Sequence, residues 1–89
     1  MHIKQNNSCF TSTFENKSVI LNSDTGIYFE FDIVASFIWS KIGIGTNISD
    51  LENEVINHFN GDTESMRISL HEFIEKLKKN GFIETNENE

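Results

Sequence analysis

The residues of this 89-residue chain that could do acid–base or metal chemistry are few and far apart. The histidines are His2, His58 and His71, which we expect at a frayed N-terminal end, at the end of one helix and in the middle of the next. A metal site needs several converging ligands, and Cys9 is the only cysteine, expected as a buried or half-buried apolar residue. The carboxylates fall at predicted helix starts or on polar helix faces. We therefore expect no catalytic site, no metal site and no cofactor.

Charge and hydropathy exclude two further classes of function. Fourteen acidic residues against seven basic ones give a net charge of -7, which repels a phosphate backbone, so we expect no nucleic-acid partner. Lys76, Lys78 and Lys79 cluster in the last turn of a predicted helix, where the helix dipole favours cations without any ligand. Contact with an acidic partner segment is the alternative for that cluster. The N-terminus does not resemble a signal peptide and no apolar run reaches the roughly 20 residues that cross a bilayer, so we expect a cytoplasmic protein without a membrane partner.

The segments that must position any site begin with three predicted strands. Residues 8–14 and 18–21, joined by a polar turn, predict a hairpin, and the turn at 22–26 leads to a third strand at 27–31. In this third strand Ile27, Phe29 and Phe31 alternate with Tyr28 and Glu30, which gives one apolar face. Such a small antiparallel sheet needs a cover on that face.

Three predicted helices supply the cover. The first is capped by Asp32, and the second begins at Ser49, where residues 49–52 fit a capping box. The third runs from about residue 63 to 79 and is followed by Gly81, which favours a left-handed cap. The order of elements predicts a single α+β domain over residues 1–84, with three antiparallel strands followed by three helices, and a disordered tail at 85–89.

The feature most suggestive of function is the third strand beside the third helix. If this strand ends the sheet, its outer backbone groups are unpaired, and an extended peptide could add to it as a fourth strand. The opposite wall of the groove would then be a helix flank carrying Arg67, Leu70, His71, Ile74 and Lys78. The side chains of Ile27, Phe29 and Phe31 are expected in the core, so that the groove uses their backbone together with the outward Tyr28 and Glu30. On this hypothesis a proline at Phe29 should abolish binding.

The same residues resemble the pyrroloquinoline-quinone-biosynthesis protein D (PqqD-like) family, the recognition elements of ribosomally synthesised and modified peptides. The resemblance covers residues 18–84, and the stand-alone members of lasso peptide gene clusters are the most similar. Asp32 stands where Asn is common and Ala35 where Gly is common, and both still allow capping and close packing. The motifs that carry the resemblance are Val19-Ile20-Leu21, Asp24-x-Gly26-x-Tyr28-Phe29-x-Phe31, Val34-Ala35, Ile38-Trp39, residues 46–51, Phe73-Ile74, Leu77 and Gly81-Phe82-Ile83.

The resemblance implies a winged helix-turn-helix-like fold without catalytic activity. Such a protein binds the leader segment of a precursor peptide between the third strand and the third helix. It hands the precursor to a separate leader peptidase, and a macrolactam-forming cyclase acts afterwards. Carried onto this chain, the peptide-binding positions are 27–31 and the five helix residues named above. The alternatives are a peptide chaperone for a radical-SAM enzyme as in PQQ biosynthesis, a winged-helix DNA-binding regulator, and an enzyme with an unrecognised site.

Overall fold

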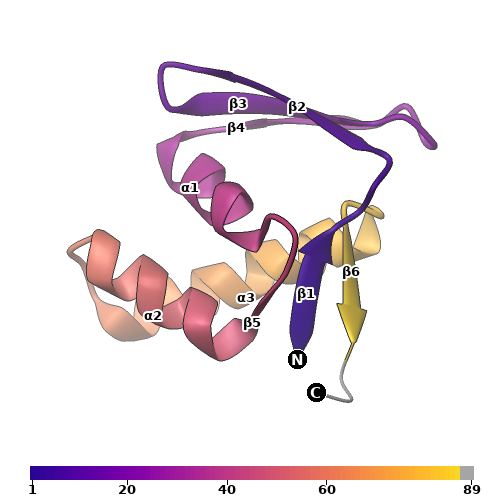
Figure 1. The fold of residues 1–89 in the computed structure, drawn as a ribbon. Helices are drawn as coiled ribbons and strands as arrows, with labels where there is room; N and C mark the ends of the chain where they lie inside the picture. The colour runs from indigo at the N-terminus through magenta and orange to yellow at the C-terminus, as the bar shows by residue number, and fades with distance from the viewer. Residues whose placement is uncertain (87–89) are drawn as a thin grey trace.

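The computed structural model describes residues 1–86 and contains two three-stranded antiparallel sheets and three helices (Figure 1). One sheet has the order β2-β3-β4 and the other the order β5-β1-β6. The predicted α+β class, with three antiparallel strands followed by three helices, is confirmed. The second sheet was not predicted. The strands are β1 (His2–Gln5), β2 (Cys9–Phe14), β3 (Lys17–Asn22), β4 (Tyr28–Phe31), β5 (Thr46–Asn47) and β6 (Ile83–Asn86), and the helices are α1 (Ile33–Ile42), α2 (Ile48–His58) and α3 (Thr63–Lys79).

The β2-β3-β4 sheet is a meander whose turns are specified locally. β2 and β3 are joined by Glu15 and Asn16, both with positive φ, as a two-residue hairpin loop requires. Between β3 and β4, the side chain of Asn22 accepts hydrogen bonds from the backbone N–H groups of Asp24 and Thr25. In Figure 1 this sheet forms the upper layer, and α1 packs beneath it.

The helix ends follow the expected capping chemistry, with one correction. Asp32 caps α1 by accepting from the N–H of Ala35, and α3 spans the predicted residues. The predicted start of α2 at Ser49 is wrong: the helix begins at Ile48, because the side chain of Asn47 accepts the N–H of Asp50 and takes the cap position.

The C-terminus of α3 ends in a Schellman motif, as the glycine suggested. Gly81 has a φ of 77° and donates its N–H to the carbonyl of Lys78, while Phe82 donates to the carbonyl of Leu77. The side chains of Leu77 and Phe82 are both fully buried. This cap turns the chain sharply away from the helix and directs β6 back along the molecule.

The β5-β1-β6 sheet corrects the predicted ends of the chain. His2, expected at a frayed end, lies in β1 and pairs with Asn86 in β6 and Asn47 in β5. The expected tail is also wrong for Thr85 and Asn86, which belong to β6, whereas residues 87–89 lie outside the described part of the chain. Ile3 at the centre of β1 is fully buried, so this sheet closes one end of the core.

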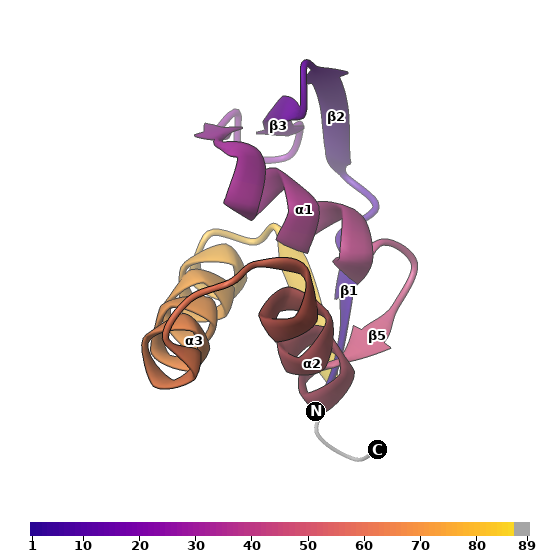
Figure 2. The same cartoon turned by 90° about the vertical axis from the view of Figure 1, so that its left-hand side faces the viewer.

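One hydrophobic core joins both sheets to the helices. The side-chain N–H of Asn22 on β3 donates to the carbonyl of Gly81, which ties the first sheet to the start of β6. Viewed after a quarter turn, α2 and α3 lie side by side below α1 (Figure 2). The buried core residues are Ile3, Ile20, Phe31, Ile38, Trp39, Ile42, Leu51, Val55, Leu70, Ile74, Leu77, Phe82 and Ile83.

Candidate peptide-binding groove

Strand β4 is an edge strand, since within the described residues it pairs only with β3. The N–H of Asn22 donates to the carbonyl of Ile27, so these two residues form a hydrogen-bonded pair. Ile20 and Phe29 form the pair that lies two residues further along the same two chain segments. Paired residues of antiparallel strands alternate between hydrogen-bonded and non-hydrogen-bonded positions. The backbone groups of Phe29 therefore point to β3, and those of Tyr28 and Glu30 point away from it. This edge thus offers the N–H and C=O groups of two residues to an added strand.

Aromatic side chains fill the space between β4 and α3. Phe31 is buried, and its ring packs edge-on against the half-buried Phe73 of α3, with 5.2 Å between ring centroids. The half-buried ring of Phe29 lies 4.8 Å from Phe82, and the Lys76 ammonium lies 4.7 Å from the Phe29 ring centroid. The floor beside the free edge is therefore apolar, with one cation from α3 above it.

A cavity of about 550 Å³ lies just past the end of β4. Its walls come from the start of α1, the end of α2 and the first half of α3. Asp32 and Asp62 are among its lining residues, and most of the others are apolar. An apolar side chain of a bound peptide would bury area there. The apolar residues that line the cavity are Val34, Ala35, Ile38, Val55, Phe59, Met66, Leu70 and Phe73.

The structure places the predicted strand residues together on or beside β4. Tyr28 and Glu30 are exposed, Phe29 is half-buried and Phe31 is buried, in agreement with the alternation. Ile27 precedes the strand and is exposed, so its side chain is not part of the core as expected.

Of the predicted helix residues, Leu70 lines the cavity, whereas Arg67 and His71 lie on a different face of α3. Arg67 and His71 both contact the Glu52 carboxylate on α2, at 3.8 Å and 2.6 Å respectively. Leu70 and Ile74 are buried in the core. Lys78 follows His71 at i+7 and therefore shares its stripe. The structure does not bring Arg67, His71 or Lys78 to the edge of β4.

Besides Leu70, four α3 residues lie toward the cavity or toward β4: Met66, Ser69, Phe73 and Lys76. Sequence reasoning named Phe73 only as part of a motif and Lys76 only as part of the cationic last turn. One signal was available: these four positions recur at i, i+3, i+7 and i+10, a second stripe beside the core stripe. The sequence left the choice between the two flanking stripes open, because both contain polar and apolar residues.

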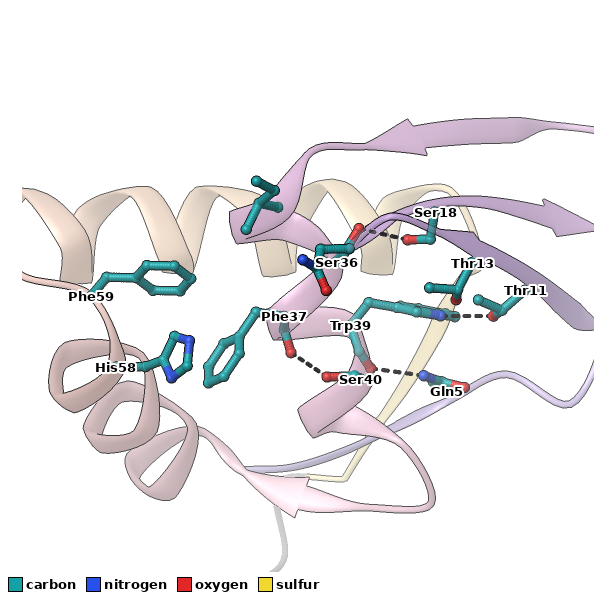
Figure 3. Close-up of a pocket in the computed structure, with 12 residues that line it drawn as sticks. Gln5, Thr11, Thr13, Ser18, Ser36, Phe37, Trp39, Ser40, His58 and Phe59 are labelled. Carbon is teal, nitrogen blue, oxygen red and sulfur yellow. Dashed lines mark hydrogen bonds between the residues drawn. The ribbon is translucent and has the colours of Figure 1, made fainter.

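A second cavity of about 600 Å³ lies beside α1 and is lined by β2, β3 and the end of α2 (Figure 3). Hydroxyl groups line much of it, and most of them already have partners: Ser18 bonds Ser36 at 2.7 Å, and Thr11 accepts from the Trp39 indole. The imidazole of His58 stacks on Phe37 at 4.1 Å. β2, which lines this cavity, is the other edge strand of the sheet in the described residues, but the hydroxyl groups beside it leave less apolar surface for peptide side chains than the cavity past β4.

Two titratable groups in the described residues, Cys9 and Asp62, have shifted pKa values. Desolvation, and secondarily the Asp24 carboxylate, raises the pKa of the Cys9 thiol above its usual value. Hydrogen bonds from Ser65 lower the pKa of Asp62, as expected for a helix cap. Within residues 1–86 no His, Cys, Asp and Glu side chains gather as metal ligands, and none of the helices is long and apolar enough to cross a membrane.

Known structures with this fold were found. The chain is similar to a structure described as TbiB1 in complex with the TbiA(beta) leader peptide, with a TM-score of 0.83, 22% identity, and coverage of 96% of this chain and 99% of that one. It is also similar to lasso peptide synthetase B1 complexed with the leader peptide, with a TM-score of 0.73, 13% identity, and coverage of 93% and 98%. No curated protein sequence matches significantly. The family model of coenzyme PQQ synthesis protein D matches residues 17–83, and the chain therefore belongs to that family.

Proposed function

We propose that this protein binds the leader segment of a ribosomal precursor peptide and has no catalytic activity of its own. The leader adds as a fourth strand to the free edge of β4, beside the α3 flank formed by Met66, Ser69, Phe73 and Lys76. The observation that carries this proposal is the free edge lying next to an apolar groove, because the edge supplies the backbone ladder and the groove supplies side-chain selection.

The energetics favour a peptide that uses both parts of the groove. Ordering a flexible peptide costs about 1–2 kcal/mol per residue, and each apolar anchor returns roughly 1.5–3 kcal/mol when it is buried. Backbone bonds to Tyr28 and Glu30 alone would not offset the ordering of a long segment. Two or three apolar anchors, packed over Phe29, over Phe73 and in the cavity past Asp32, would offset that ordering cost.

Family membership and the two solved relatives support a role in peptide maturation. Both relatives were solved with a leader peptide bound, and one is named as a lasso peptide synthetase component. By extension, the bound precursor is presented here to a separate leader peptidase, with a macrolactam-forming cyclase acting afterwards, in lasso peptide biosynthesis. A chaperone role for a radical-SAM enzyme, as in PQQ biosynthesis, is the second candidate, and the family assignment itself favours it.

The test is a calorimetric titration with the leader peptide encoded beside this protein. We expect a dissociation constant between about 1 μM and 1 nM, or roughly -8 to -12 kcal/mol. Glu30→Pro should abolish binding, because the lost N–H points to the peptide and not to β3. Glu30→Ala keeps that N–H and should bind the leader.

A proline at Phe29, which the sequence suggested, would not distinguish lost strand addition from a damaged sheet. The Phe29 N–H belongs to the ladder with β3, so Phe29→Pro would disrupt the sheet itself and leave the cause of any lost binding ambiguous. Leader binding by a folded Glu30→Pro protein, with its circular dichroism unchanged, would refute strand addition at β4.

A further inference from the structure

The ammonium group of Lys76 lies beside β4, although the residue belongs to the last turn of α3. Its nitrogen is 4.7 Å from the centroid of the Phe29 ring, which is within the range of a cation–π contact. The side chain is exposed, and within residues 1–86 it forms no salt bridge. Lys76 therefore places a cation without a carboxylate partner over the floor of the groove.

The position of this ammonium is not explained by a partner on its own helix. Glu72 precedes Lys76 by four residues, which is the spacing at which a glutamate and a lysine on one helix form an ion pair. In the structure the two side chains form no such pair, and the ammonium lies over the Phe29 ring instead. The contact with β4 thus holds the cation where an added strand would meet it.

The pairing of strands determines which leader residue meets Lys76. Residues directly opposite each other in paired strands have side chains on the same face, with their Cβ atoms about 4.5–5.5 Å apart. The side chain of Phe29 points inward, whereas Tyr28 and Glu30 are exposed. The leader residue opposite Phe29 therefore also points inward, toward the ring and the ammonium, and its two neighbours point outward.

A glutamate fits this position by its chemistry. Its methylene groups can lie against the Phe29 ring while its carboxylate meets the Lys76 ammonium. The surroundings disfavour an acidic residue further along the groove, because the carboxylates of Asp32 and Asp62 are among the residues that line the cavity past β4. The protein as a whole also has a net charge of -7, which repels an acidic segment elsewhere. The groove thus has a cation at one end and anions at the other.

This difference in charge distinguishes one register of the added strand from the next. A shift by two residues keeps the same leader side chains inward, so alternation alone does not exclude it. The same shift would move an acidic leader residue from Lys76 toward Asp32, or away from the groove. Electrostatic complementarity of this kind contributes more to register and specificity than to affinity.

We propose that Lys76 selects precursors whose leader has an acidic residue, preferably glutamate, opposite Phe29, and that this ion pair fixes the register of the added strand. The inference rests on the proposed function and names the leader chemistry that the same site accepts. An ion pair that is fully exposed contributes little. Here the bound leader and the Phe29 ring exclude part of the water around the pair, which strengthens it.

The test is a charge exchange between the protein and the leader peptide encoded beside it. The protein variant is Lys76→Glu, and the matched control is Lys78→Glu, which changes the same charge in the same last turn of α3 on the flank that bears His71. Lys76→Met keeps an apolar stem over Phe29 and removes only the charge. The leader variants each have one acidic residue changed to lysine. Every pair of protein and peptide is titrated by calorimetry.

We expect Lys76→Glu to weaken binding of the unsubstituted leader by about tenfold, because attraction is replaced by repulsion. Lys78→Glu should stay within about twofold of the unchanged protein, and Lys76→Met should lie between the two. One lysine-substituted leader should bind the unchanged protein about tenfold more weakly and regain most of that loss with Lys76→Glu, but not with Lys78→Glu. That leader residue is then the one opposite Phe29.

Three results would overturn the proposal. Equal losses with Lys76→Glu and Lys78→Glu would mean that only the net charge matters. Failure of every lysine-substituted leader to bind better to Lys76→Glu than to the unchanged protein would exclude the ion pair. A leader that binds tightly without any acidic residue in its bound segment would do the same. If the unchanged protein does not bind the unsubstituted leader, the proposed function fails instead, and this titration is performed first. Circular dichroism verifies that the variants are folded.

Discussion

The two sheets of this protein are both antiparallel and three-stranded, yet their surfaces differ in kind. In the β5-β1-β6 sheet the large apolar side chains, Ile3 and Ile83, are buried, and none of its described residues is a large exposed hydrophobic. The β2-β3-β4 sheet has exposed aromatic residues on its outer face and a free edge beside an apolar groove. The β5-β1-β6 sheet holds the ends of the domain together, and the β2-β3-β4 sheet offers surfaces that the fold itself does not need.

Truncating one apolar residue in each sheet should give the largest contrast. Ile3→Ala leaves a cavity in the core and should lower the free energy of unfolding by about 2–5 kcal/mol. Leu21→Ala removes a partly exposed side chain and should cost about 1 kcal/mol or less. Urea denaturation measures both values. Equal losses would mean that the two sheets do not differ in this way.

The two flanks of α3 can be compared by leader titration. Phe73→Ala removes the ring that packs on Phe31 and should weaken leader binding by about 1.5–3 kcal/mol, or roughly 10- to 150-fold. His71→Ala removes a contact with Glu52 on the other flank and should leave leader affinity unchanged. If His71→Ala weakened leader binding and Phe73→Ala did not, the leader would bind the helix face that was first predicted from the sequence. Circular dichroism of both variants verifies that they are folded.

The connection between the sheets depends on Asn22. Asn22→Ala leaves the Gly81 carbonyl and the Asp24 N–H without their partner and should lower unfolding free energy by about 1–3 kcal/mol. Asn7→Ala, at an exposed position in the turn between β1 and β2, serves as the control and should have little effect. A negligible loss for Asn22→Ala would show that the sheets are joined by apolar packing alone.

The smallest expected effect is a pH dependence at the same junction. The Cys9 thiol donates to the Phe82 carbonyl, and burial raises its pKa above 9.0. The native state therefore retains a proton that the unfolded chain releases, so stability from this group is complete below pH 9 and declines as pH rises through the native pKa. Urea denaturation at pH 7 and pH 10 gives the fall in unfolding free energy between these pH values. This fall should be larger for the unchanged protein than for Cys9→Ala, which has no thiol to titrate. Parallel declines would exclude the thiol as the cause.

Local signals predicted the elements whose ends depend on nearby residues. Asp32 and Gly81 specified the start of α1 and the end of α3, because a capping carboxylate and a left-handed glycine act on the adjoining turn. The cap of α2 was misplaced by two residues because Asn47 and Ser49 are both good caps and only one can take the position.

Pairing between distant residues could not be predicted in the same way. The β1–β6 ladder aligns His2 with Asn86, and neither end of the chain has the long alternating pattern that marks a strand. Its stability comes from burying Ile3 and Ile83 in a core assembled by the rest of the molecule. The choice of flank on α3 was likewise open until the packing of Phe73 on Phe31 was known.

The amino-acid sequence alone determined the aromatic strand at Tyr28–Phe31, the helix that follows it and the class of fold, because alternation, capping and helical spacing act within a few residues. The tertiary structure alone decided that β4 has one free edge, that Lys76 lies over the Phe29 ring of that strand, and that Phe10 and Tyr28 share an uncovered face. These properties depend on which distant segments pack together, and packing is decided by burial across the whole chain.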